Sequence, residues 1–209
     1  PLPRALNGGL LARGDSPEHL TALAEHGIDP IDMVVVNLYP FVETISKPDV
    51  TLADALENTD IGGPTVLRAA SKNFPSVALV VGPADYCWVG EKLANGGLTV
   101  ADRRGLAGKA FHHVSTYDSA VTGYLLGNDS GGEELPESLT ISLTKISGLR
   151  YGENPHQSGA LYSESSAPVG MAGARQLHGR ELSYNNLMDA DAAWRTASDF
   201  LDATVSVVK

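Results

Sequence analysis

Two short apolar runs organise the first half of the chain. "MVVVNLYPF" (33–41) and "VALVVG" (77–82) are continuous, rich in β-branched residues and flanked by Gly, Pro or Asp. Such runs predict strands buried on both faces. Because a helical pattern lies between them, the strand, crossover and strand order predicts a parallel pair in an α/β layer.

Several segments carry signals for the start of a helix. Ser16-Pro17-Glu18 combines a cap, a proline in the first turn and an early acid. Thr51-x-x-Asp54 and Thr99-x-x-Asp102 resemble capping boxes. The last of these predicts a helix that extends to Gly127, although the three glycines within it weaken the helical pattern. Residues 83–93 predict one more helix.

The pattern changes after residue 127. "GNDSGGEELPES" (127–138) is polar, acidic and glycine-rich, which is typical of a linker. Beyond it, residues 139–146 alternate like a half-exposed strand, and a polar loop enters a second strand near residue 160. Residues 183–201 predict a helix, and "ATVSVVK" (203–209) predicts a last strand. We therefore predict a boundary near residue 130, with domains 1–130 and 131–209.

The composition indicates which classes of partner the protein is not expected to bind. The formal net charge is -10. An acidic surface argues against duplex nucleic acid as a partner. No apolar run reaches membrane-spanning length and no signal peptide is visible, so we expect no membrane partner. The single cysteine, Cys87, excludes an intrachain disulfide, favours a cytoplasmic location and is expected to be a buried packing thiol. The chain begins at Pro1 and ends at Lys209 directly after an apolar run, so we expect a piece of a longer protein.

"TDIGGPTVLRAASKN" (59–73) carries the first candidate site. Gly62-Gly63 permits a tight turn, and the amides that follow it could hold an anion at the start of a helix. Arg68 and Lys72 are four residues apart and share one helix face. Spacing alone favours a simpler reading, in which Asp60 caps a helix that carries two surface cations. Both readings stay open.

The other polar clusters are weaker indications of a functional site when each is considered alone. Asn37 and Tyr39 follow the first strand and read as turn residues, unless that strand end lies beside the glycine turn. In "RYGENPHQ" (150–157), Arg150 suits an oxyanion, and His156 is either a general base or an ordinary loop histidine. The adjacent histidines at 112–113 face different sides of a helix, so we expect no metal site.

Four motifs together carry a resemblance. "VVVNLYPF", "DIGGPTVLRAASKN", "LRYGENPHQ" and "ELSYNNLMDADAAW" occur in this order. In order and approximate spacing they resemble the bifunctional purine-biosynthesis family, AICAR transformylase/IMP cyclohydrolase. The resemblance extends over nearly the whole chain after the first several residues. Four ordered motifs form a much more specific signal than any one of them.

The resemblance implies the fold class α/β: a methylglyoxal-synthase-like parallel sheet domain, N-terminally incomplete, followed by the start of a cytidine-deaminase-like transformylase domain, C-terminally incomplete. It implies that the first domain closes the ring of FAICAR to give IMP. It assigns Tyr39, Asp60 and Lys72 to the cyclohydrolase catalytic site. Nucleotide contacts, partly through the backbone, are expected from Asn37, Leu38, Ile61 and Gly62.

For the second domain, the resemblance implies formyl transfer from the co-substrate 10-formyltetrahydrofolate to AICAR, without a metal. Arg150 and Tyr151 match an AICAR-contacting pair, and Asn186 matches a nearby polar residue. Lys209 matches a lysine that stabilises the transition state. The intact parent is expected to be a cytoplasmic homodimer that acts on the nucleotides AICAR, FAICAR and IMP.

Two alternatives to an active enzyme stay open. Related α/β domains serve as regulatory nucleotide-binding modules without chemistry. A truncated polypeptide can also be inactive alone: Asn7 stands where the family motif has a histidine, and the Lys-Thr pair that opens this motif is not found.

Overall fold

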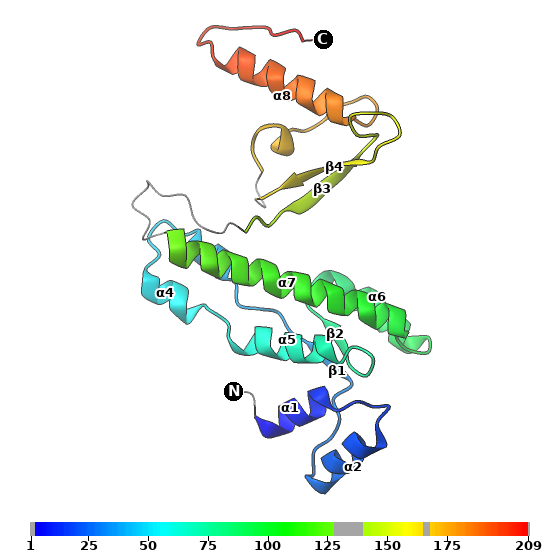
Figure 1. Ribbon diagram of the computed structural model, residues 1–209. Coiled ribbons are helices and arrows are strands. Elements are labelled where there is room, and N and C mark those ends of the chain that lie inside the picture. Colours follow the sequence, from blue (N-terminus) through cyan, green and yellow to red (C-terminus); the bar gives the residue numbers. More distant parts are fainter. Residues whose placement is uncertain (1–2, 128–139, 165–167, 209) are drawn as a thin grey trace. The chain divides into compact units, whose positions relative to one another are not determined.

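Two parallel strands organise the first half of the computed structural model, which describes residues 3–127, 140–164 and 168–208 (Figure 1). Strand β1 (Met33–Val35) pairs with β2 (Ala78–Val80), with Val34 opposite Leu79. The pairing continues past β1, because the Val36 amide donates to the carbonyl oxygen of Val80 at 3.1 Å. The predicted parallel α/β layer is confirmed, with strands shorter than the apolar runs suggested.

Helices precede, connect and follow this pair. Their bounds are α1 (Arg4–Leu11), α2 (Pro17–Glu25), α3 (Phe41–Ile45), α4 (Leu52–Glu57), α5 (Gly62–Lys72), α6 (Tyr86–Ala94) and α7 (Val100–Gly127), with the 3-10 turn η1 (Pro83–Asp85) before α6. Helices α5 and α7 both contact β2. The segment that connects β1 to β2 therefore ends in α5, which returns the chain to the sheet.

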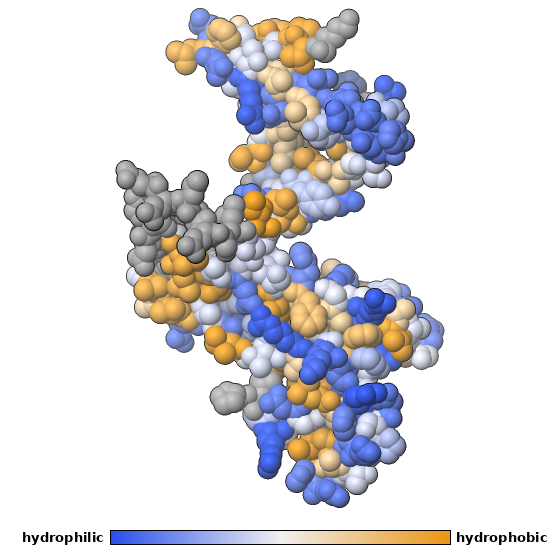
Figure 2. Space-filling view, viewed as in Figure 1, coloured by the Kyte–Doolittle hydropathy of each residue, from blue (hydrophilic) through white to orange (hydrophobic). Residues whose placement is uncertain are grey.

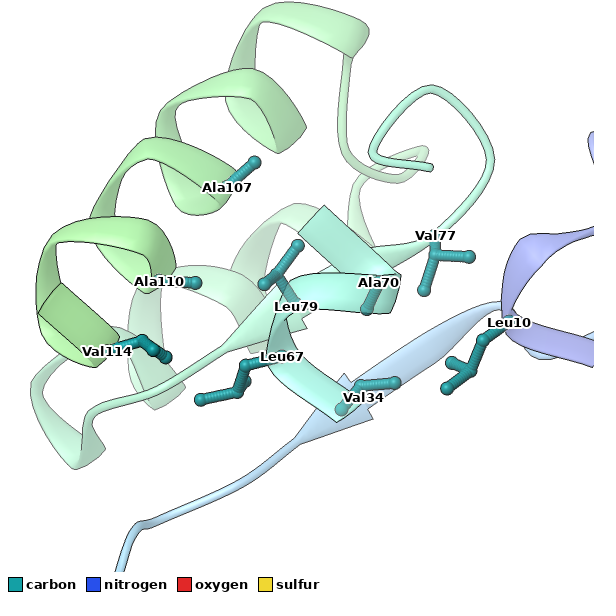
Figure 3. Close-up of a cluster of buried hydrophobic side chains, with 9 residues drawn as sticks. All are labelled: Leu10, Val34, Leu67, Ala70, Val77, Leu79, Ala107, Ala110 and Val114. Carbon is teal, nitrogen blue, oxygen red and sulfur yellow. The ribbon is translucent and has the colours of Figure 1, made fainter. Parts of the chain in front are cut away.

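The main core lies where α5 and α7 meet the strands (Figure 3). Leu67 and Leu79 are fully buried within it. Ala70, Ala107 and Ala110 are buried at the same contact, where small side chains let helix and strand backbones approach closely. Burying each leucine contributes about 1.5–3 kcal/mol. This packing fixes α5, and with it the turn at its start.

The burial of β1 differs from the prediction. All three residues of β2 are buried, as predicted for a strand covered on both faces. In β1, Val34 packs into the core, but Val35 is 53% exposed. On the second face of the pair, Val80 is buried with Val89 and Leu106, and Met33 packs against this cluster. A strand needs cover on both sides to be buried throughout, and on its second face β1 is covered at Met33 but not at Val35.

Helix α7 runs without interruption for 28 residues. The predicted helix to Gly127 is therefore confirmed, and its glycines (Gly105, Gly108 and Gly123) have open space where a side chain would project. The buried face instead carries Leu106, Ala110, Val114 and Tyr117 at helical spacing. Tertiary packing along this face therefore outweighs the low helix propensity of the glycines.

Cys87 corrects a second prediction. It was expected to be a buried thiol, but it is exposed. Val89 is the buried residue of α6, and a residue two positions away projects roughly 200° around the helix from it. The cysteine therefore faces solvent.

Apolar side chains are also exposed along α3, α4 and the end of α7, and Figure 2 shows hydrophobic surface around α4 and the end of α7. The exposed side chains on these helices are Val42, Leu52, Leu56, Leu125 and Leu126. Beneath them lies a second buried cluster of Phe41, Ala55 and Tyr117. This cluster joins three helices and lies next to the glycine turn.

The second compact unit is Glu137–Lys209, and the first is Pro1–Pro136. The predicted boundary near residue 130 and most of the predicted linker lie outside the described residues. In the second unit β3 (Thr144–Leu149) pairs antiparallel with β4 (Gly159–Ser163), followed by the 3-10 turn η2 (Gly170–Gly173) and α8 (Tyr184–Ser198).

The last predicted strand is wrong. Residues 203–208 form no strand, and Val205 and Val207 are 87% and 89% exposed. A strand needs a pairing partner for its backbone groups, and none of the described residues pairs with this segment.

The two predicted capping boxes are confirmed. Their carboxylates are expected to make the stability of the protein depend on pH in the acid range. Hydrogen bonds from Thr51 lower the pKa of Asp54, and those from Thr99 lower the pKa of Asp102. A carboxyl group with a lower pKa in the folded than in the unfolded state adds stability above its ordinary pKa. That stability is lost as the pH falls through the lowered value.

We expect the double variant Asp54→Asn/Asp102→Asn to lose less of its free energy of unfolding than the unsubstituted protein as the pH falls below about 4. Urea denaturation at a series of pH values measures this. Glu57→Gln is the matched control, since none of the described residues hydrogen-bonds to the Glu57 side chain. An equally steep acid limb in the double variant and the control would contradict the prediction.

Candidate functional site at a strand end and a glycine turn

Asp60 holds the turn that starts α5. Its carboxylate Oδ1 accepts a hydrogen bond from the Gly63 amide at 2.7 Å. Its own amide donates to the Tyr117 hydroxyl oxygen at 2.7 Å. The interpretation of Asp60 as a helix cap is therefore confirmed. The carboxylate also places negative charge at the positive end of the helix, where the sequence suggested an anion.

Gly63 marks a close approach between two segments that are distant in sequence. A Cβ atom at this position would lie 2.6 Å from Asp60 Oδ2 and 2.6 Å from Leu38 Cδ2. The Leu38 side chain, which follows β1, thus reaches the glycine turn. The strand end and the turn lie side by side, the condition under which the sequence favoured a joint site.

The predicted residues at this edge differ in exposure. Tyr39 is 55% exposed and Ile61 is 74% exposed, so both side chains are accessible. Gly62 has open space on its side-chain face. Leu38 is partly buried against the core, so contact through its backbone fits better than contact through its side chain.

Asn37 is held by a residue that the sequence did not single out. Its side-chain amide exchanges hydrogen bonds with the Tyr86 hydroxyl, at 3.3 and 3.4 Å. Tyr86 begins α6, after β2. The ends of both parallel strands therefore contribute polar groups to the same edge.

Lys72 lies apart from this edge. It is the last residue of α5, eleven residues long, so the helix rise places it about 15 Å from Gly62 along the axis. It lines a pocket of about 400 Å³ together with Arg13, His19 and Ser76. No carboxylate of the described residues forms an ion pair with Lys72. The structure thus brings Asp60 close to the strand end, but not Lys72.

Arg13 interacts with two other residues that line this pocket, Asp15 and His19. Its guanidinium pairs with Asp15 through two hydrogen bonds of 3.0 and 2.8 Å. Its backbone amide donates to His19 Nδ1 at 3.1 Å. Arg68, the other cation of the quoted stretch, pairs with Asp118 and ties α5 to α7. Of the two cations expected on the surface of α5, Arg68 is thus paired with a carboxylate.

The second unit holds Arg150 against Tyr151. The guanidinium carbon lies 4.8 Å from the centre of the Tyr151 ring, and Arg150 Nη2 donates to the hydroxyl at 3.3 Å. Arg150 Nε is buried, and no hydrogen-bond partner for it is found among the described residues. Backbone hydrogen bonds join this pair to residues 182 and 184. Two polar loops therefore meet here.

Asn186 has a local role in this unit. Its side-chain oxygen accepts from both the amide and the hydroxyl of Ser183, at 3.1 and 3.0 Å, in a capping box at the start of α8. Its predicted role as a polar site residue is untested. Lys209 lies outside the described residues, so its predicted role is also untested.

Metal ligands do not gather in the described parts of the chain: no group of three or more His, Cys, Asp or Glu side chains is placed to hold a metal ion. Among the described residues, no helix is both long and apolar enough to cross a membrane.

The sequence reading missed Tyr117 as well as Tyr86. Tyr117 is 57 residues from Asp60 in the chain, and no spacing rule connects them. The available signal was the helical periodicity that places Tyr117 on the buried face of α7.

The parallel strands, the returning helix and the polar groups at the strand ends define an α/β domain with a candidate ligand-binding site at the edge of its sheet. A family model described as an MGS-like domain matches residues 5–65. A second model, the AICARFT/IMPCHase bienzyme, matches residues 70–209, more than half of the chain. The chain belongs to the AICARFT/IMPCHase bienzyme family, as its four motifs predicted.

Curated relatives agree with this assignment. The chain is 51% identical over 207 residues to the bifunctional purine biosynthesis protein PurH of Listeria innocua, and 50% identical to that of Listeria welshimeri. The alignments cover 98% of this chain and 40% of each relative. A solved structure described as the crystal structure of ForH is 38% identical, with a TM-score of 0.53, and covers 60% of this chain and 65% of that one.

The close approach at Gly63 makes a testable prediction. In Gly63→Ala, the new methyl group must displace the Asp60 carboxylate and the end of Leu38. We expect a loss of about 1 kcal/mol in the free energy of unfolding, because the helix cap is disturbed. Urea denaturation measures this loss.

Gly62→Ala is the matched control, because a methyl group there meets nothing within 4 Å. We expect Gly62→Ala to leave stability unchanged or to raise it by up to about 1 kcal/mol, since alanine favours the helix. Equal effects of the two substitutions would contradict the close approach.

Proposed function

We propose that the chain supplies the IMP cyclohydrolase site and the first part of the AICAR transformylase of a bifunctional enzyme for the last two steps of IMP synthesis. Its membership in the bienzyme family and the names of its PurH relatives support this proposal. Because the chain spans 40% of the length of those relatives, the proposal concerns the complete enzyme of this family. The observation that carries it is the contact between the strand end and the glycine turn.

Cyclohydrolase chemistry sets definite requirements. The carboxamide nitrogen of FAICAR attacks the carbon of its formyl group, and negative charge develops on the formyl oxygen. The carboxamide nitrogen loses one proton and the formamide nitrogen loses another, the former formyl oxygen takes up both, and the carbon–oxygen bond breaks to release water. An acceptor near the amide and a donor near the oxygen accelerate these steps. Holding both reacting groups of one folded substrate together supplies much of the rate.

Asp60 and Tyr39 fit these requirements. One carboxylate oxygen of Asp60 is used by Gly63, whereas Oδ2 accepts no hydrogen bond from the described residues. Oδ2 is proposed to orient the carboxamide or accept its proton. The hydroxyl of Tyr39, a residue that is 55% exposed, is proposed to donate to the formyl oxygen. The backbone at Leu38, Ile61 and Gly62, with the side chain of Asn37, is proposed to contact the nucleotide.

Lys72 is proposed as a second electrophilic group. Its distance from the glycine turn means that this assignment rests on the family motif. The test below therefore treats Lys72 separately from Asp60.

The transformylase proposal rests on the second unit. Arg150 and Tyr151 are proposed to bind AICAR, and Asn186 to contribute a polar contact nearby. Lys209 is proposed to stabilise the transition state of formyl transfer from the co-substrate 10-formyltetrahydrofolate. The stacked guanidinium supports an anion- or ring-binding role for Arg150, as does its buried Nε, which has no hydrogen-bond partner among the described residues. A cytoplasmic homodimer is the proposed assembly.

A full-length chimera tests the cyclohydrolase proposal. This chain replaces the matching segment of the Listeria innocua relative, and the conversion of FAICAR to IMP is followed by absorbance. We expect turnover by the chimera and a loss of about 10²–10⁴-fold in kcat with Asp60→Asn, since asparagine keeps the capping oxygen but accepts no proton. Lys72→Met is expected to show a loss of similar size.

Arg68→Gln is the control, because it removes a positive charge from the same helix and is expected to retain turnover. Full activity of Asp60→Asn would overturn the role of Asp60, and full activity of Lys72→Met would overturn that of Lys72. Saturable IMP binding without turnover in the unsubstituted chimera would favour the regulatory nucleotide-binding module instead.

A further inference from the structure

Tyr117 connects α7 to the turn that carries Asp60. Its side chain is buried, with 8% of the residue exposed. Its hydroxyl oxygen accepts from the Asp60 amide at 2.7 Å and donates to the carbonyl oxygen of Asn58 at 3.3 Å. One phenol group therefore satisfies two backbone groups on either side of Thr59.

The Tyr117 ring is fixed by its neighbours. It meets Phe41 edge-on, with ring centres 6.0 Å apart. Phe41 in turn meets Tyr124 at 5.9 Å. Ala55 completes the buried cluster. Because Phe41 directly follows the strand-end residues, the same cluster that orients Tyr117 also anchors the segment that carries Tyr39.

The hydroxyl works as donor and acceptor together only when it is protonated. Burial raises the pKa of Tyr117 above its ordinary value, while the hydrogen bond from Asp60 acts in the opposite direction. The neutral phenol is therefore the form that holds the turn at physiological pH.

We infer that Tyr117 is a positioning residue for Asp60. By fixing residues 58–60, its hydroxyl keeps the Asp60 carboxylate on the Gly63 amide and leaves Oδ2 for the substrate. The inference rests on the cyclohydrolase activity proposed above, and it adds a residue from α7 to a site otherwise built from the strand end and the glycine turn.

The first test uses the 209-residue chain and needs no activity. Tyr117→Phe keeps the ring and removes the hydroxyl, so the Asp60 amide loses its acceptor. We expect protection of this amide from hydrogen exchange, measured by NMR, to fall about tenfold, as for the loss of one hydrogen bond. Tyr124→Phe is the matched control: it lies two turns further along α7 in the same cluster, and its hydroxyl has no partner among the described residues.

The second test measures turnover in the full-length chimera. We expect Tyr117→Phe to lower kcat about tenfold with little change in KM, while Tyr124→Phe leaves both unchanged. In an Asp60→Asn background, Tyr117→Phe is expected to have no further effect on kcat, because it acts through the Asp60 carboxylate. If Tyr117 only stabilised the fold, Tyr117→Phe would lower kcat by the same factor whether residue 60 is Asp or Asn.

Unchanged protection of the Asp60 amide in Tyr117→Phe would overturn the inference. So would equal reductions of kcat by Tyr117→Phe in the presence and absence of the Asp60 carboxylate. An inactive unsubstituted chimera would instead overturn the proposed function, and the exchange experiment would still decide whether Tyr117 holds the turn.

Discussion

The packing of α5 and α7 against β2 is the constraint on which the site depends. Leu67 and Ala70 fix one side of α5 against the strand, and Ala110 and Val114 bring α7 onto the same core. With both helices held, the start of α5 meets the end of β1, and Tyr117 comes within hydrogen-bond distance of Asp60. The polar edge is thus a consequence of a hydrophobic contact.

Much of this arrangement could be predicted from local patterns. The β-branched runs predicted the parallel strands, and the Thr-x-x-Asp pairs predicted the starts of α4 and α7, because these signals act within a few residues. The exposure of Val35 and Cys87 could not be predicted, since it depends on which faces other elements cover. The predicted last strand failed for a similar reason, because pairing needs a partner that the local sequence does not specify.

The residues of the candidate site also fall into those that local sequence patterns predict and those that they do not. Asp60 could be assigned as a cap from its place before two glycines. The expected tight turn at these glycines is wrong, because both lie in α5 and neither has a positive φ; Gly63 is required by the close approach of Asp60 and Leu38. Tyr117 and Tyr86 could not be found, because their partners lie 57 and 49 residues away. Ordered family motifs supplied what spacing lacked, but they gave no distances. The position of Lys72 at the far end of α5 is information that only the structure contains.

The strand end and the glycine turn together are proposed to bind a purine nucleotide. Titration of the 209-residue chain with IMP, followed by backbone amide NMR shifts, measures this binding residue by residue. We expect saturable shifts that are largest at residues 37–39 and 60–63. The absence of shifts there, or shifts confined to the pocket around Arg13 and Ser76, would contradict it.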